Sequence, residues 1–213
     1  MNPENLMYLG FGIAGAGIFA NTSLDREVQD RYNRNVQSSG TDDVSKVLRQ
    51  PGEVFLTVPL LIGSYAFFSD TPVGDWSQRS LRALAVGGPS TLFLRSAMGG
   101  AAPSDGDSDW RPFHDRHGVS GHAFIGAVPF MTAAGMNENL YAKTSLYAIS
   151  ALPALSRIND NAHYFSQAAL GWYIAYLSCN AVGKSSVKGG KEFSLYPVLL
   201  SNNGFALVGT MTF

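Results

Sequence analysis

The chain has 213 residues, of which 46% are hydrophobic and only 15% are charged, and its formal net charge is −1. This length suits one domain, or one domain with a small appendage. A nearly neutral chain without Lys- or Arg-rich runs excludes a nucleic-acid-binding surface. The single cysteine, Cys179, excludes an internal disulfide bond and a multi-cysteine metal site.

Six apolar segments without Lys, Arg, Asp or Glu follow one another along the chain: residues 6–23, 54–69, 83–94, 118–137, 144–156 and 162–183. Three or four of them approach the roughly 20 residues that cross a bilayer, and the others have the length of buried core helices. The mean hydropathy of +0.03 is low for a protein with six spans. We predict an all-α bundle of about six helices, embedded in a membrane, with a soluble helical bundle as the alternative.

Polar stretches separate these segments. Residues 24–37 alternate in charge and space Leu24, Val28 and Tyr32 four residues apart, which predicts a surface helix that ends near Gly40. Residues 99–118 are rich in Gly, Pro, Asp and Ser and predict a loop.

The tail after residue 183 changes character. A linker-like stretch rich in Lys, Ser and Gly is followed by alternating apolar residues on both sides of Asn202-Asn203-Gly204, a hairpin turn signal. We therefore predict a helical domain over residues 1–183, and a linker with a C-terminal β-hairpin over residues 184–213.

Successive antiparallel helices bring certain helix ends together. The end of the third apolar segment, the start of the fourth, the end of the fifth and the start of the sixth would lie at one end of the bundle. These ends carry Arg95, Ser120-Gly121-His122, Arg157 and His163. Cationic side chains beside the amides of a helix N-terminus suit an oxyanion such as phosphate.

These residues also form a family pattern. Ser156-Arg157, followed after five residues by His163, together with the upstream Ser120-Gly121-His122, resembles the type 2 phosphatidic acid phosphatase superfamily. That superfamily also includes class A acid phosphatases, glucose-6-phosphatase and vanadium haloperoxidases. The resemblance implies a metal-independent, cofactor-free phosphatase acting on a lipid, isoprenoid or other small-molecule phosphate.

The resemblance also implies a role for each residue. His163 would attack phosphorus and form a phosphohistidine, and His122 would protonate the leaving alkoxide. Arg95, Arg157 and the backbone amides near Ser120 and Gly121 would bind the phosphoryl oxygens. For such a protein we expect the bacterial inner membrane, with the site facing the periplasm.

Three positions depart from the family pattern. Gln167 stands where the family has the aspartate that orients the nucleophilic imidazole, and Ala102 stands where it has an arginine. Val119, in place of a proline, is a mild change. Arg111 and Asp160 are the candidates for replacing the missing arginine and aspartate.

The departures keep other functions open. A degenerate relative would bind an anionic head group or serve as a structural or interaction protein without catalysis. A vanadate-dependent oxidoreductase is a third reading, and the loss at Ala102 argues against it because vanadate needs a cation-rich site. His114 and His117 could be imagined as metal ligands together with Asp115, but we interpret them as residues of a solvated loop.

Overall fold

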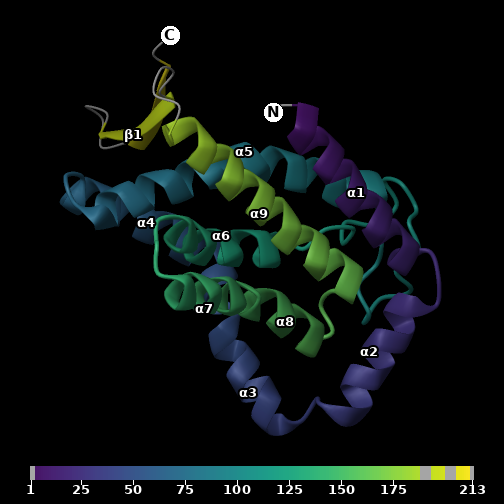
Figure 1. Cartoon of the computed structure of the whole chain (residues 1–213). Coiled ribbons are helices and arrows are strands. Elements are labelled where there is room, and N and C mark those ends of the chain that lie inside the picture. Colours follow the sequence, from purple (N-terminus) through teal and green to yellow (C-terminus); the bar gives the residue numbers. More distant parts are fainter. Residues whose placement is uncertain (1–2, 188–192, 200–204, 212–213) are drawn as a thin grey trace.

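Helix α9 (Phe165–Val187) crosses the middle of the molecule and organises its core (Figure 1). The computed structural model describes residues 3–187, 193–199 and 205–211. Helix α9 packs against α6 (Gly121–Gly135), α5 (Pro72–Met98) and α1 (Pro3–Ala20). Buried apolar side chains from these helices, including Phe124, Met131, Leu170 and Ile174, form the main core. Removal of this surface from water holds the four helices together.

The remaining helices surround this centre. They are α2 (Leu24–Asn35), α3 (Ser39–Leu48), the 3₁₀ helix η1 (Gln50–Gly52), α4 (Val54–Phe68), α7 (Leu140–Ser150) and α8 (Leu152–Asn159). In Figure 1, α2 and α3 form an arm at the lower end of the molecule. The all-α prediction is confirmed for the helical part, but nine α-helices are described instead of about six.

Two local features account for the additional helices. Helix α3 follows the predicted surface helix because Ser38 and Thr41 form a capping box that starts a new helix. The fifth apolar segment is divided into α7 and α8 at Ala151, with a proline at the start of α8. A proline restricts the residue before it and suits the first turn of a helix, so the break falls where Pro153 allows it.

Helix α2 is confirmed as a helix, but its buried side chains are polar. Asp25 is fully buried, and its carboxylate accepts hydrogen bonds from the Ser166 backbone amide (2.9 Å) and hydroxyl (2.5 Å). A carboxylate at this position satisfies and stabilises the N-terminus of α9. Gln29 donates to the Ile158 carbonyl and to the Asn161 side chain, both at 3.0 Å. Helix α2 thereby fixes the α8–α9 turn.

The C-terminal part contains two strands. Strands β1 (Phe193–Leu199) and β2 (Phe205–Met211) pair antiparallel, with Leu199 opposite Phe205. The predicted turn at Asn202-Asn203-Gly204 lies outside the described residues, so the hairpin stays a prediction. Helix α9 extends to Val187, past the predicted domain boundary at residue 183, and the division into two domains also stays a prediction.

Within the described part of the chain, no single helix has the length and apolarity to cross a bilayer. Two bent pairs of helices meet these criteria together, residues 4–20 with 24–35 and residues 39–52 with 54–68, bent by 69° and 49°.

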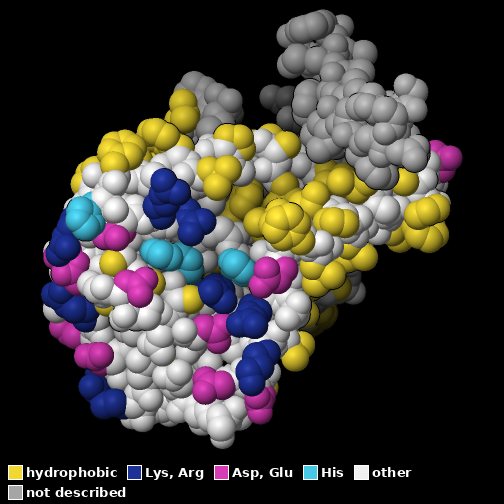
Figure 2. All heavy atoms as spheres, turned by 180° about the vertical axis from the view of Figure 1, so that it is seen from behind, with side chains coloured by type: hydrophobic (Ala, Val, Ile, Leu, Met, Phe, Trp, Pro, Cys, Tyr) yellow, Lys and Arg dark blue, Asp and Glu magenta, His cyan; other side chains and the backbone are white. Residues whose placement is uncertain are grey.

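Apolar and charged side chains are segregated on the surface. Figure 2 shows hydrophobic side chains over the upper part of one face, while arginine, lysine, acidic and histidine side chains gather lower down. Helices α1, α4 and α5 carry many exposed large apolar side chains, among them Phe11, Phe55, Phe67 and Leu92.

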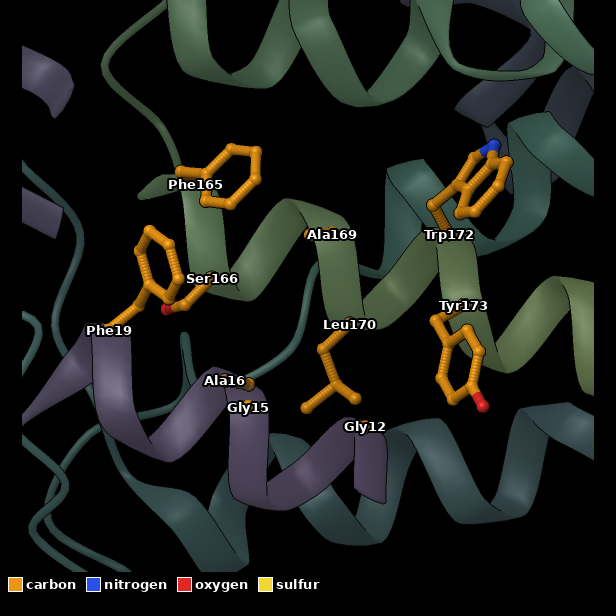
Figure 3. A pocket seen from close by; sticks show the side chains of 10 residues that line it. All are labelled: Gly12, Gly15, Ala16, Phe19, Phe165, Ser166, Ala169, Leu170, Trp172 and Tyr173. Carbon is orange, nitrogen blue, oxygen red and sulfur yellow. The ribbon is translucent and has the colours of Figure 1, made fainter. Parts of the chain in front are cut away.

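An apolar pocket of about 300 Å³ lies between α1 and α9. Its walls include Phe19, Phe165, Leu170 and Tyr173, and Figure 3 shows the two phenylalanines at one end and Tyr173 at the other. None of the residues predicted for the phosphate site lines this pocket.

Candidate active site

His163 lies in the turn before α9 and is almost completely buried, with 5% of its surface exposed. Its Nδ1 is 3.0 Å from Gln167 Oε1. The same Oε1 accepts a hydrogen bond from the Tyr164 backbone amide (3.1 Å), and Gln167 Nε2 donates to the Ala101 carbonyl (2.8 Å).

These backbone partners decide the orientation of the Gln167 amide. An amide N–H only donates and a carbonyl only accepts, so Gln167 presents its oxygen, and not its nitrogen, to His163. His163 Nδ1 must then carry the proton and donate to Gln167. The unprotonated atom of the ring is Nε2, which is the tautomer that a nucleophilic histidine needs.

Burial also sets the charge of this imidazole. It lowers the pKa of His163 to about 3, and nearby His117, Arg157 and Arg95 act in the same direction, while the hydrogen bond with Gln167 opposes them. His163 is therefore neutral over the whole physiological pH range.

Arg95 lies in the last turn of α5, where the loop that follows turns back. Gly99 ends the helix with a φ of 66°, a left-handed conformation that suits glycine. The returning loop donates from the Gly118 amide to the Arg95 carbonyl (3.2 Å) and from the His117 amide to the Gly100 carbonyl (3.0 Å). The Arg95 Nε donates to the Arg116 carbonyl.

Helix α6 begins against the start of α9. Ser120 is its N-cap, and the Ser120 hydroxyl accepts from the Ala123 amide at 3.3 Å. The Ser120 amide donates to the backbone carbonyl of Gln167 (2.9 Å). This amide therefore already has a partner, although we expected it to bind phosphate. A Cβ on Gly171 would lie 2.3 Å from the Ser120 carbonyl oxygen, so only glycine allows this close approach. The amide of Gly121 opens the helix, and the space where a Cβ would stand is empty.

His122, in the first turn of α6, is more open than His163. Its side chain is 34% exposed, and its Nε2 is 3.2 Å from Glu53 Oε1. The pKa of His122 is lowered overall, chiefly by burial and next by the charge of Arg157, while the hydrogen bond and charge of Glu53 oppose this shift. Glu53 thus favours the protonated form of this histidine.

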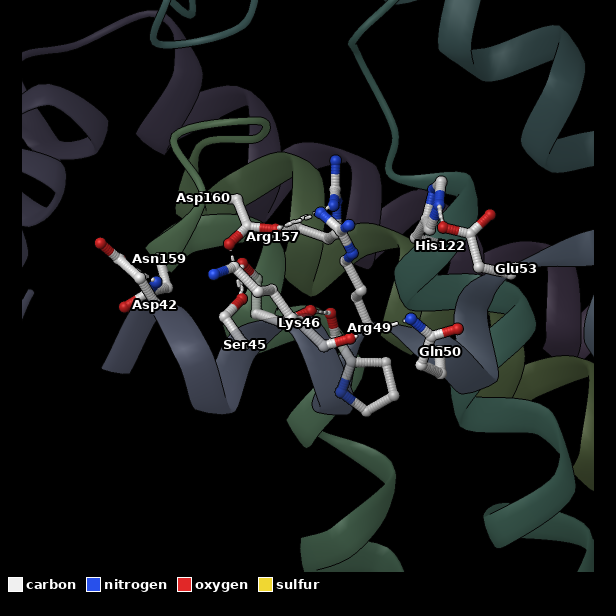
Figure 4. Close-up of polar contacts among 12 residues, drawn as sticks. Asp42, Ser45, Lys46, Arg49, Gln50, Glu53, His122, Arg157, Asn159 and Asp160 are labelled. Carbon is white, nitrogen blue, oxygen red and sulfur yellow. Dashed lines mark hydrogen bonds and ion pairs between the residues drawn. The ribbon is translucent and has the colours of Figure 1, made fainter. Parts of the chain in front are cut away.

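Arg157, near the end of α8, is joined to a second arginine through one carboxylate (Figure 4). Asp160 Oδ2 is 3.1 Å from Arg157 Nη1 and 3.6 Å from Arg49 Nη1, and its Oδ1 accepts from Ser45 at 2.6 Å. Asp160 therefore pairs with the arginines and does not replace the aspartate missing at Gln167. It is the C-cap of α8, and not a cap of α9.

The predicted convergence of helix ends is present. The start of α6 is bonded to α9 through Ser120 and Gln167, Gly118 is bonded to Arg95 at the end of α5, and the His163 amide donates to the Arg157 carbonyl at 3.2 Å. Figure 2 shows histidine side chains near the centre of this face, with basic side chains above and below them.

Arg111, the candidate to replace the missing arginine, is paired elsewhere. Ala102 is buried, with 3% of its surface exposed. Arg111 pairs with Asp107 at 2.9 Å, and its own side chain is 54% exposed. Val119, the mild departure, is fully buried in the main core.

Three residues of this region were not predicted. His117 was interpreted as part of a solvated loop, but it is half-buried and its ring centre is 5.5 Å from that of His163. His114 does fit that interpretation, being exposed and paired with Asp115. Arg49 and Glu53, on either side of η1, join the site from outside the recognised motifs, and no local signal in the sequence marks them.

Comparisons with known proteins agree with this arrangement. Among solved structures, the chain is similar to the crystal structure of Aquifex aeolicus LpxE, with a TM-score of 0.60, 19% sequence identity, and coverage of 78% of this chain and 98% of that one. At this identity the likeness concerns the fold. No curated protein matched the sequence. The sequence pattern of the PAP2 superfamily matches residues 81–188, just over half of the chain. Because this range contains Arg95, His122, Arg157 and His163, the chain belongs to the PAP2 superfamily.

Proposed function

We propose that the protein is a phosphatase that hydrolyses the phosphate ester or diphosphate of a lipid, an isoprenoid or another small molecule through a phosphohistidine. The observation that supports this most directly is the fixed tautomer of His163, whose Nδ1 donates to Gln167 so that Nε2 is free to attack. Membership of a superfamily that contains lipid phosphatases supports the class of reaction.

The residues divide the reaction between them. Arg95, Arg157 and the Gly121 amide bind the phosphoryl oxygens and stabilise the charge that spreads over them in the transition state. His163 Nε2 forms a bond to phosphorus while the bond to the leaving oxygen breaks. His122 donates its proton to that oxygen. Water then attacks the phosphohistidine, with His122 as the base, and releases phosphate and free His163.

Neutral Gln167 makes the reaction slower than an aspartate would. The imidazole gains positive charge when it is phosphorylated, and an amide oxygen stabilises that charge less than a carboxylate does. The hydrogen bond still orients the ring. We expect slow but measurable turnover.

Phosphate release tests the proposal. The purified protein should release phosphate from at least one member of a panel of lipid, isoprenoid and soluble phosphate esters, and His163→Ala should abolish this. His114→Ala is the matched control, because it removes an exposed histidine that is paired with Asp115. Equal activity in His163→Ala and wild type would contradict the mechanism.

A non-catalytic anion-binding protein is the second candidate. It is favoured by buried Ala102, which offers no donor, and by neutral Gln167. This candidate predicts saturable binding of phosphate or a phospholipid head group without phosphate release from any ester. Loss of that binding in Arg157→Ala would separate it from non-specific attraction.

We also propose that the protein is bound to a membrane, the bacterial inner membrane, with the site on the periplasmic side. The exposed apolar side chains of α1 and α4, such as Phe11 (66% exposed) and Phe55 (90% exposed), support this. Flotation with liposomes should recover the wild-type protein, and a Phe11→Ser, Phe55→Ser double variant should float less. Accessibility of a cysteine introduced at exposed His114, in a variant with Cys179→Ala, would report the side of the membrane.

A further inference from the structure

The reaction proposed above places a nucleophile and a leaving group on opposite sides of phosphorus, and the charged residues divide in the same way. His163 is surrounded by Gln167, His117 and the charges of Arg95 and Arg157. His122 is surrounded by Glu53 and the charges of Arg157 and Arg49. Arg157 is common to both sides. Arg49 acts on the His122 side, which is the side of the leaving group.

The backbone holds Arg49 in this position. It immediately precedes η1, and η1 packs directly on the first turn of α6. A Cβ on Gly52 would lie 2.7 Å from the His122 carbonyl oxygen, so there is no room between the two segments. Glu53, the partner of His122, directly follows η1. Arg49 and the proposed acid are therefore carried by two backbone segments in contact.

The two arginines have more hydrogen-bonding capacity than their partners use. Arg49 and Arg157 share the single carboxylate of Asp160, which leaves one positive charge in the group. In both guanidinium groups the Nε is buried and has no acceptor among the residues that the structure describes. An unsatisfied buried donor is costly, and an oxyanion offers the missing acceptors. Figure 4 shows the two guanidinium groups next to each other, with His122 and Glu53 farther along the site.

We propose that Arg49 binds the leaving group, and that the site therefore favours substrates whose leaving group carries its own negative charge, organic diphosphates being the simplest class. An alkoxide leaving group needs the proton of His122 and gains little from a fixed cation once it is protonated. An organic phosphate leaving group departs as an anion that keeps the electron pair of the broken P–O bond. A guanidinium binds such an anion through two N–H groups.

This inference rests on the proposed function, and a substrate pair separates the two. Geranyl diphosphate and geranyl phosphate share the same alcohol and differ in the leaving group. Arg49→Ala should lower kcat/KM for the diphosphate at least tenfold more than for the monophosphate. Arg49→Lys, which keeps the charge, should recover part of the difference. Lys46→Ala removes a positive charge from the last turn of α3, just before Arg49, where Lys46 pairs with exposed Asp43, and it should leave the ratio of the two substrates unchanged.

The outcomes are distinguishable. Equal losses for both substrates in Arg49→Ala would assign Arg49 to a structural role through Asp160 and overturn the inference, while hydrolysis that depends on His163 would leave the proposed function intact. Should Arg49→Ala fail to fold, Arg49→Gln keeps hydrogen-bonding capacity without the charge and takes its place.

A binding measurement decides the case in which the wild type hydrolyses neither substrate. The wild-type protein should then bind inorganic pyrophosphate at least tenfold more tightly than phosphate in calorimetry, and Arg49→Ala should abolish that preference. An unchanged preference would overturn the inference even though the proposed function had also failed.

Discussion

His163 and His122 belong to the same candidate site but lie in contrasting surroundings. His163 is 5% exposed, and its partner Gln167 is itself held by two backbone groups. The side chain of His122 is 34% exposed, and its partner Glu53 is 43% exposed. The buried histidine has its tautomer and charge fixed by the fold, whereas the open one has its charge adjusted by neighbouring ionised groups. One position suits a nucleophile that never changes its proton, and the other suits an acid that must exchange one with solvent.

The largest effects should come from replacing the two histidines, and the loss of activity should depend on the leaving group for His122 but not for His163. His163→Ala should lower kcat by at least about a thousandfold with every substrate, because no other nucleophile replaces it. His122→Ala should lower kcat/KM, which reports the phosphorylation step alone, by about a hundredfold to a thousandfold with an alkyl phosphate, which needs a general acid. With p-nitrophenyl phosphate, whose leaving group needs no proton, the loss of kcat/KM in His122→Ala should be less than about tenfold.

Steady-state kinetics of both variants on the two substrates check this difference. Circular dichroism and thermal melts would show that each variant is folded. If His122→Ala were as inactive as His163→Ala with p-nitrophenyl phosphate, His122 would be needed for something other than proton donation.

The next effect concerns the support of the buried histidine. Gln167→Leu should lower kcat by about a hundredfold, because Nδ1 of His163 loses the acceptor that fixes its tautomer. It should also lower the free energy of unfolding by about 3 kcal/mol, since the Tyr164 amide and the Ala101 carbonyl lose their partner in a buried region. Chemical denaturation and kinetics on the same preparation measure both quantities.

Gln29→Leu is the matched control for that variant. Gln29 is also buried, and it bonds to the α8–α9 turn without contacting His163. We expect a comparable loss of stability with a much smaller loss of kcat. Equal losses of kcat in the two variants would mean that general loosening of the turn explains the effect of Gln167→Leu.

The histidines and arginines of the family motifs were the more predictable part of the site from the sequence. Arg95, Arg157, His122 and His163 lie at or next to the ends of successive helices, and successive helices tend to pack as neighbours, so their order along the chain was enough to predict that those ends meet. What the sequence left ambiguous was the orientation of the Gln167 amide. That orientation depends on the carbonyl of Ala101, a residue 66 positions away.

The residues that reach the site from outside the family motifs could not be predicted, because their position depends on packing that no local sequence pattern reveals. Arg49 and Glu53 reach the site because α3, η1 and α4 pack around the start of α6, and the contact at Gly52 fixes their distance from His122. His117 was misread because a loop rich in Gly, Pro and Asp predicts solvent exposure. The left-handed turn at Gly99 instead brings that loop back over α5.

A smaller effect is expected from a negative charge placed next to the buried His163. Gln167→Glu keeps the size of the side chain and sets a carboxylate oxygen beside Nδ1 of His163. It should raise kcat about tenfold, because the carboxylate stabilises the charge that the imidazole gains on phosphorylation. It should also lower the free energy of unfolding by about 1–2 kcal/mol, because the Ala101 carbonyl loses its donor.

In Gln167→Glu, kcat should therefore rise while the free energy of unfolding falls. The histidine resonances followed by NMR against pH should show a raised pKa for His163 in Gln167→Glu. An unchanged kcat with a raised pKa would mean that phosphorylation of His163 does not limit turnover.

The smallest effect should appear at His122, in the pH dependence of kcat/KM of the Glu53→Gln variant. The hydrogen bond and charge of Glu53 raise the pKa of His122, so their removal lowers that pKa. The acid must be protonated in the free enzyme, and kcat/KM therefore falls as the pH rises past the pKa of His122. In Glu53→Gln this fall should begin at a lower pH, and at neutral pH the loss should be about threefold, as expected for a partly exposed ion pair. Ionisation of the substrate affects both proteins equally and cancels in the comparison.

Asp75→Asn provides the control, because Asp75 is a carboxylate of similar exposure (44%) that pairs with Arg79 instead of a histidine. Its pH profile should match that of the wild type. The acidic side of the profile should be the same in all three proteins, since His163, with its pKa lowered to about 3, stays neutral there whatever happens at Glu53. A shift of the acidic side in Glu53→Gln would show that the two histidines are coupled through the site, and the separation between a fixed nucleophile and an adjustable acid would then have to be abandoned.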